Sequence, residues 1–228
     1  FESYTRREIP SAVLGPAEGQ ITLFGTETIA TDPTHARRVA NGLTRLGPMV
    51  RERVMTGFLS TEEEKDLILL RFARRCFDEG PRAVQMLGDP DVHAAFVLER
   101  NVNNEVCRFI EFIRFEEKDG MLGSVIHPKN NVLPLLRGHF CSRLPDEDFL
   151  IFDAAHGTAL LRQSGHVQYL AMEHYEPARD ADELNWQALW KRFFHALTIE
   201  ERRNAKAQMS HAPKRFWGGM VEMREPYI

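Results

Sequence analysis

Apolar residues at helical spacing dominate the first half of the chain. Asp32-Pro33 is a typical helix start, and Ser60 followed by three glutamates is another, with a stop at Gly80. Asp89-Pro90 predicts a third helix. Its apolar stripe is Val92, Phe96, Val102, Val106 and Phe109. We therefore expect about three helices before residue 110. Residues 10–33 are rich in Pro and Gly around the apolar run Ile21 to Phe24, which predicts an extended arm or hairpin ahead of them.

The pattern becomes β-like between residues 110 and 175. Residues 109–117 and 121–127 flank a Lys118-Asp119-Gly120 turn, which is a hairpin signal. Asn130 or Asn131 can cap a helix that runs to Arg143. Three short strands are then predicted at 149–153, 158–162 and 167–171. The order ββαβββ predicts an antiparallel sheet with one helix crossing a face.

The chain returns to helix after residue 175. Asp180 or Asp182 leads a helix that carries an apolar set: Trp186, Leu189, Trp190, Phe193, Phe194 and Leu197. Thr198 to Glu201 is a capping box that predicts the start of another helix. The fold class is therefore α+β. We divide the chain into an extended arm with helices (1–109), a sheet region (110–175) and a basic helical region (176–228), and expect them to form one compact unit.

Composition excludes several classes of protein. No apolar run reaches the roughly 18 residues of a membrane span, so no membrane association is expected. The three cysteines form no Cys-x-x-Cys pair, which predicts reduced thiols in the cytoplasm. His139 and Cys141 invite a metal hypothesis, but side chains two residues apart on a helix point about 200° apart. We expect no metal, and we find no motif for a cofactor.

Positive charge gathers near the C-terminus of a chain whose net charge is −4. Residues 186–219 carry seven Lys and Arg against Glu200 and Glu201, together with all three tryptophans. This combination favours nucleic-acid binding. The expected contact residues are Arg143, Lys191, Arg192, Arg202, Arg203, Asn204, Gln208, Lys214, Arg215 and Trp217.

Two features of this basic segment suggest how it contacts a strand. On a continuous helix, Glu201, Asn204 and Gln208 share one polar face. The corner Pro213 to Trp217 places cations beside rings on which an unpaired base can stack. The alternative is a solvated helix face and a tryptophan that closes the core. A strand that is single or damaged suits this pattern better than a sequence-specific duplex.

A second candidate site surrounds Asp153, which follows the apolar strand Phe149 to Phe152 and lies close to His156 in sequence. A partly buried acid there is a candidate general acid or base, whereas the alternative is a carboxylate that accepts hydrogen bonds within a turn. Arg114 lies inside an apolar run, which predicts an inward ion pair with Asp153. Together with His139, these two residues form the predicted pocket.

Short motifs along nearly the whole chain resemble a bacterial domain-of-unknown-function family labelled "probable DNA metabolism protein". The matching residues are Gly19 to Gly25, Glu105 to Arg108, Phe112 to Phe115, Pro128 with Asn131, His139-Phe140, Leu150 with Asp153, Leu189-Trp190, Glu201 with Asn204, Gln208, and Pro213 with Arg215 and Trp217. The chain departs from the family pattern at Cys107 and at Ala154.

The resemblance implies work beside a radical SAM protein in DNA modification or repair, and similar domains occur fused to uracil-DNA-glycosylase-like proteins. The first hypothesis is therefore a cytoplasmic accessory protein that handles DNA with this radical SAM partner. The second is an enzyme acting on a nucleotide or base, with Asp153 as acid or base and Arg114 or Arg143 holding phosphate. The third is an interaction scaffold that never contacts DNA.

Overall fold

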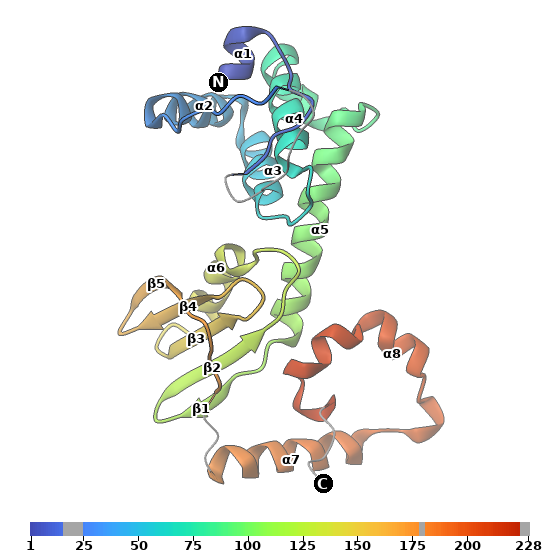
Figure 1. Cartoon of the computed structure of the whole chain (residues 1–228). Helices are drawn as coiled ribbons and strands as arrows, with labels where there is room; N and C mark the ends of the chain where they lie inside the picture. The colour runs from blue at the N-terminus through green and yellow to red at the C-terminus, as the bar shows by residue number, and fades with distance from the viewer. Residues whose placement is uncertain (16–24, 178–180, 224–228) are drawn as a thin grey trace. The chain divides into compact units, whose positions relative to one another are not determined.

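A computed structural model describes residues 1–15, 25–177 and 181–223 of the chain (Figure 1). The predicted apolar run Ile21 to Phe24 and the alternative cap Asp180 lie outside these described residues. The structure separates into two compact units, which we call the N-terminal unit (Phe1–Asn103) and the C-terminal unit (Asn104–Ile228).

The N-terminal unit is helical. Its helices are α1 (Glu2–Arg6), α2 (Pro33–Leu46), α3 (Pro48–Phe58), α4 (Lys65–Glu79), the 3₁₀ helix η1 (Pro81–Gln85) and the first part of α5 (Pro90–Phe112). Asp32 caps α2 by accepting hydrogen bonds from the backbone amides of Thr34 and His35, as predicted. Gly80 follows α4 with φ of 83°, a conformation that suits glycine, and this confirms the predicted stop.

Two details of the N-terminal unit differ from the sequence prediction. The helix expected after Ser60 begins only at Lys65, and the Ser60 hydroxyl instead accepts a hydrogen bond from the backbone amide of Glu62. Helices α2 and α3 are separated by Gly47, whose φ is 117°. Because Pro48 fits only the first turn of a helix, α2 ends before it and a separate helix, α3, begins there.

The cysteines differ in their surroundings. Cys76 on α4 is fully buried in the core of the N-terminal unit, beside Phe72 and Val92. Burial raises the pKa of its thiol to about 11. Cys107 on α5 is exposed, and Cys141 is half-buried.

The C-terminal unit contains a five-stranded sheet with the predicted element order ββαβββ. Its strands are β1 (Glu116–Lys118), β2 (Met121–Ile126), β3 (Asp148–Asp153), β4 (Thr158–Gln163) and β5 (His166–Ala171). Its helices are the end of α5, α6 (Leu133–Arg143), α7 (Ala181–Leu197), α8 (Ala205–His211) and the 3₁₀ helices η2 (Glu200–Arg202), η3 (Lys214–Gly219) and η4 (Val221–Met223). The α+β class is confirmed.

The sheet is mixed, which corrects the antiparallel prediction. β2 pairs parallel to β3, from Met121 opposite Asp148 to Ile126 opposite Asp153, whereas the other neighbours are antiparallel. Helix α6 lies between β2 and β3 in the chain. It returns the chain to the end of the sheet at which β2 began, so β3 runs in the same direction as β2. The hairpin turn is as predicted: Asp119 and Gly120 both have positive φ, which fits a tight two-residue turn.

Three boundaries in the C-terminal unit were predicted wrongly. Residues 109–112 belong to α5 rather than to a strand, because Phe109 and Phe112 continue the helical apolar stripe. Helix α6 begins at Leu133, and the Asn130 side chain does not cap it but donates a hydrogen bond to Glu105. Asn204, not Thr198, caps the last helix, by accepting a hydrogen bond from the backbone amide of Ala207.

The sheet is well packed around its central strand, β3. Phe149, Ile151 and Leu160 are fully buried, and the inward residues of α6 are Leu133, Leu136 and Phe140. On the other face, a cluster around Leu150 and Phe152 packs against Tyr175. Within the described ranges, no helix is long and apolar enough to cross a membrane.

Candidate nucleic-acid interface

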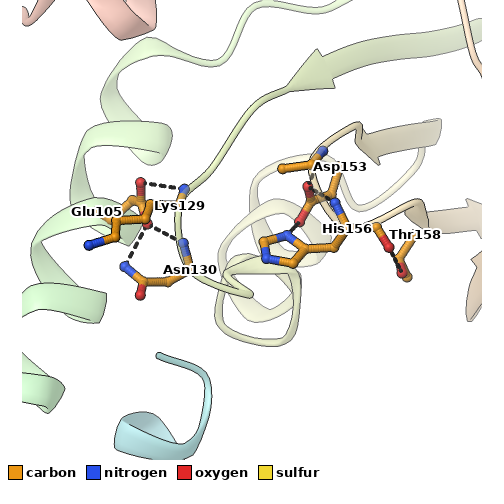
Figure 2. A network of polar contacts seen from close by, with 7 residues as sticks. Glu105, Lys129, Asn130, Asp153, His156 and Thr158 are labelled. Atoms are coloured by element: carbon orange, nitrogen blue, oxygen red, sulfur yellow. Dashed lines mark hydrogen bonds and ion pairs between the residues drawn. The ribbon is translucent and has the colours of Figure 1, made fainter. Parts of the chain in front are cut away.

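A buried carboxylate, Glu105 on α5, organises one end of the C-terminal unit (Figure 2). Its oxygens accept hydrogen bonds from the backbone amides of Lys129 (2.9 Å) and Asn130 (2.8 Å) and from the Asn130 side chain (2.7 Å). Its side chain is only 2% exposed. A buried charge is tolerated when its lone pairs are satisfied in this way. Glu105 therefore holds the loop between β2 and α6 against α5.

The same carboxylate anchors the basic C-terminal segment. A guanidinium nitrogen of Arg215 lies 3.2 Å from Glu105 Oε1. The neighbouring Phe216 is buried, with its ring 5.0 Å from that of Phe109 and 5.7 Å from that of Phe112. An ion pair and an aromatic cluster thus attach η3 to the end of α5.

Asp153 lies at the end of β3 and is fully buried. One oxygen accepts hydrogen bonds from the backbone amides of Ala155 (3.0 Å) and His156 (3.1 Å), and the other lies 2.7 Å from His156 Nδ1 (Figure 2). Burial raises the pKa of the Asp153 carboxyl above its ordinary value, and the hydrogen bonds from His156 oppose this rise. This is the turn role that the sequence left open as an alternative to catalysis.

The predicted ion pair between Arg114 and Asp153 is wrong. Arg114 lies just after α5, where its Nη1 donates to the backbone carbonyls of Glu111 and Ile113, both at 3.1 Å. Asp153 is already satisfied by the turn and by His156. Because helix ends leave unpaired carbonyls, a cation placed there is stabilised without a carboxylate partner.

His139, the third predicted pocket residue, is half-buried on α6 with its ring edge-on to Phe140. Arg114 lines a cavity that Asp153 does not.

The predicted nucleic-acid contacts are mostly at the surface. Exposed side chains are those of Arg143 at the end of α6, Arg192 on α7, Arg202 on η2, Arg203, Asn204, and Lys214 and Arg215 on η3. Lys191, Gln208 and Trp217 are half-buried. The structure gathers Lys214, Arg215 and Trp217 on one 3₁₀ helix, whereas Asn204 lies outside α8 as its cap. The predicted polar face shared by Glu201, Asn204 and Gln208 is therefore wrong.

Trp217 is held more firmly than a freely accessible ring. Its indole nitrogen donates to the backbone carbonyl of Ala212 at 2.8 Å, and Lys214 Nζ lies 5.8 Å from the ring centroid. Gln208 donates to the sulfur of Met223. Both side chains thus contribute to the packing of the C-terminal segment.

Helix α7 provides the aromatic surface that Trp217 was expected to supply. No residue of α7 is buried, and the exposed fractions are 69% for Trp186, 42% for Trp190 and 54% for Phe193. These three positions follow helical spacing, so they lie on one side of the helix. Lys191 and Arg192 are on the same helix. The arrangement combines stacking rings with cations, the pattern of surfaces that bind single strands.

Some structurally decisive residues were absent from the predicted site. Glu105 had a recognisable signal, because it interrupts the apolar stripe three residues after Val102 and four before Phe109. Tyr175 and the Gly218-Gly219 pair had none, since they come from irregular segments whose path depends on tertiary structure. In the parts of the chain that are described, no group of three His, Cys, Asp or Glu side chains is placed to hold a metal ion.

The C-terminal unit is thus an α+β structure with a basic, aromatic surface segment anchored to a buried acid. Residues 63–222 match a protein family described as a domain of unknown function, DUF4130. Since the match covers more than half of the chain, the chain belongs to this family. The chain matches no curated protein and no solved structure.

Proposed function

We propose that the C-terminal unit binds nucleic acid through residues 186–219, as an accessory protein in DNA repair or modification. The observation that carries the proposal is the exposed helix α7, where Trp186, Trp190 and Phe193 share one side and Lys191 and Arg192 extend from other sides of the same helix. Bases stack on exposed rings whatever their identity, and cations bind the phosphates between them. A single or damaged strand is the expected ligand, because its bases are accessible.

The basic segment carries more positive than negative charge, and the neighbouring Glu222 accepts a hydrogen bond from the Trp190 indole nitrogen at 2.9 Å. Residues 186–219 contain seven Lys and Arg and two Glu. Within this segment Arg215 forms an ion pair with Glu105. Arg192, Arg202 and Lys206 are exposed, and none of their side chains is seen in an ion pair or hydrogen bond with the described residues.

A radical SAM protein as partner, and action in the cytoplasm, are part of the same proposal. Both rest on the resemblance of the short sequence motifs. The alternative of an interaction scaffold is favoured by the same exposed α7 face, because exposed apolar patches also bind proteins. A measurement of nucleic-acid binding distinguishes the two alternatives, because the scaffold is expected not to bind DNA.

A salt titration tests the proposal. Affinity for a single-stranded oligonucleotide should fall with salt, with a log-log slope on the order of −3 to −5 if that many phosphates are neutralised. The triple variant Arg192→Glu, Arg202→Glu, Lys206→Glu should flatten this slope by about 2 to 3. Fluorescence anisotropy at four salt concentrations measures both values.

A matched control places the same charge change elsewhere. Arg37→Glu, Arg45→Glu and Arg51→Glu reverse three exposed arginines of the N-terminal unit and should leave the slope unchanged. Trp186→Ala should weaken single-strand binding about tenfold and duplex binding less, while Phe58→Ala, an exposed ring in the N-terminal unit, should change neither. A salt slope near zero in the wild type contradicts nucleic-acid binding. An equal flattening of the slope in the two triple variants contradicts the placement of the binding surface on residues 186–219.

A further inference from the structure

The C-terminal unit contains a cavity of about 710 Å³ beside strand β2. This volume lies within the range of about 300 to 1,000 Å³ that is typical of small-molecule sites. β1 pairs with β2 only as far as Gly123, so the edge of β2 from Ser124 onward is not covered by β1. The cavity is built by Arg114 and Glu116, by β2, by the loop that carries Tyr175, and by Gly218 and Gly219 of η3.

One wall of the cavity is aromatic and apolar. Tyr175 and Phe152 meet edge to face with ring centroids 6.3 Å apart, and Val125 lies beside them. Tyr175 packs directly over Gly123, where a Cβ atom would lie 2.0 Å from the tyrosine oxygen. Glycine is thus required for this placement of the ring. Two aromatic rings thus line this wall of the cavity.

The remaining walls carry polar groups of complementary kinds. Arg114 uses only Nη1 for its two carbonyl contacts, so Nε and Nη2 have no partner among the described residues. His127 is exposed at the same wall. Glu116 and Ser124 are buried, with exposed fractions of 3% and 4%. Burial and the nearby Glu116 carboxylate raise the pKa of Tyr175, which keeps its phenol protonated and able to donate a hydrogen bond.

We propose that this cavity binds one nucleotide unit, with its phosphate at Arg114 and its base against Tyr175. Arginine matches phosphate oxygens with paired N–H groups. The ring supplies a stacking surface, and the acid and hydroxyls supply an acceptor and donors for the edge of a base. The cavity thus combines a cation, a ring and buried polar groups.

The choice of nucleotides as the ligand class rests on the proposed function, whereas the site is separate from the α7 surface. The nucleotide can be a free deoxynucleoside monophosphate or the 5′-terminal unit of a strand. The chemistry at Arg114 and Tyr175 is the same in both cases.

A substitution that fills the cavity tests the site without removing a contact. Gly218 lines the cavity, its backbone does not require glycine, and a Cβ atom there meets nothing within 4 Å. Gly218→Leu should therefore fold and occupy the space. Gly138→Leu is the control, because Gly138 on α6 is equally open but does not line the cavity. Thermal unfolding of both variants checks that they fold.

Isothermal titration calorimetry with the four deoxynucleoside monophosphates measures binding. The wild type and Gly138→Leu should bind at least one of them, and Gly218→Leu should lose most of this binding. Arg114→Gln should weaken monophosphate binding about tenfold but change binding of the matching nucleoside, which lacks the phosphate, less than about twofold. Failure of the wild type to bind any monophosphate overturns the proposal. Equal binding by Gly218→Leu, or equal affinity for inorganic phosphate, also overturns it.

Two further arms separate this site from the α7 surface and identify the source of the nucleotide. The triple variant at Arg192, Arg202 and Lys206 should keep monophosphate binding, so a wild type that binds strands but no monophosphate refutes the cavity proposal alone. A wild type that binds monophosphates but shows no salt-dependent strand binding refutes the proposed function alone. If Gly218→Leu also weakens binding of a 5′-phosphorylated strand, the site takes a strand end; if it does not, the site takes free nucleotides.

Discussion

Glu105→Ala should destabilise the C-terminal unit by about 3 to 5 kcal/mol, because it removes one member of a buried charge network and leaves its partners without an acceptor. The backbone amides of Lys129 and Asn130, the Asn130 side chain and the Arg215 guanidinium all lose their shared partner. Urea unfolding followed by circular dichroism measures the change in the free energy of unfolding.

Two variants distinguish the network from a general effect of charge. Glu111→Ala removes an acid on the same helix whose side chain is 52% exposed, so it should cost less than about 1 kcal/mol. Glu105→Gln should be intermediate, because its amide oxygen can serve Asn130 while its NH₂ group faces the Lys129 amide and Arg215. If Glu105→Ala costs no more than Glu111→Ala, the buried network does not stabilise the unit.

Asp153→Ala should cost about 3 kcal/mol, because the turn after β3 loses the acceptor for two backbone amides and for the His156 ring. Asp153→Asn should cost no more than about 1 kcal/mol at neutral pH, since its oxygen still accepts from both amides. A neutral His156 can adopt the tautomer in which Nδ1 carries no proton, and Nδ1 then accepts a hydrogen bond from the new amide group. Chemical denaturation of both variants measures the difference.

The pH dependence of this difference has a defined sign. Burial raises the pKa of Asp153 in the folded protein, so the folded state binds the proton more tightly than the unfolded state. This contribution to stability is present below the unfolded-state pKa of about 4 and is lost as the pH rises towards the folded-state pKa. Asp153→Asn does not titrate, so it should gain on the wild type as the pH is raised from about 4 to 7. A difference that stays constant over this range contradicts the raised pKa.

Local signals in the sequence were sufficient for much of the fold. Asp32, Gly80 and the Asp119-Gly120 turn act through neighbouring backbone groups, and each was predicted correctly. The parallel pairing of β2 with β3 was missed because short strands carry no sign of their direction, which depends on the path through α6. Phe109 and Phe112 fit a strand as well as a helix end, so the boundary there depended on packing.

The candidate site was predictable only in part. Cationic side chains such as Arg192 and Arg202 are exposed, as a count of charges suggests. The predicted pairing of Arg114 with Asp153 was wrong because each side chain binds to nearby backbone groups. Arg114 donates to carbonyls at the end of α5, and Asp153 accepts from amides of the turn that follows β3. The cavity could not be predicted, since it depends on Tyr175 lying over Gly123, two residues more than fifty positions apart in the chain.

The different surroundings of the three thiols make the protein suitable for single-site labelling. Maleimide reagents attack the thiolate, so the buried Cys76, with a pKa of about 11, should be nearly inert at neutral pH. Cys107 is exposed, and Cys141→Ser leaves it as the one accessible thiol of the chain. Cys107 lies two positions along α5 from Glu105. A fluorophore attached there is next in the chain to Arg108, whose guanidinium donates to the backbone carbonyl of His211 in the basic segment, and can report on that segment without a further engineered cysteine.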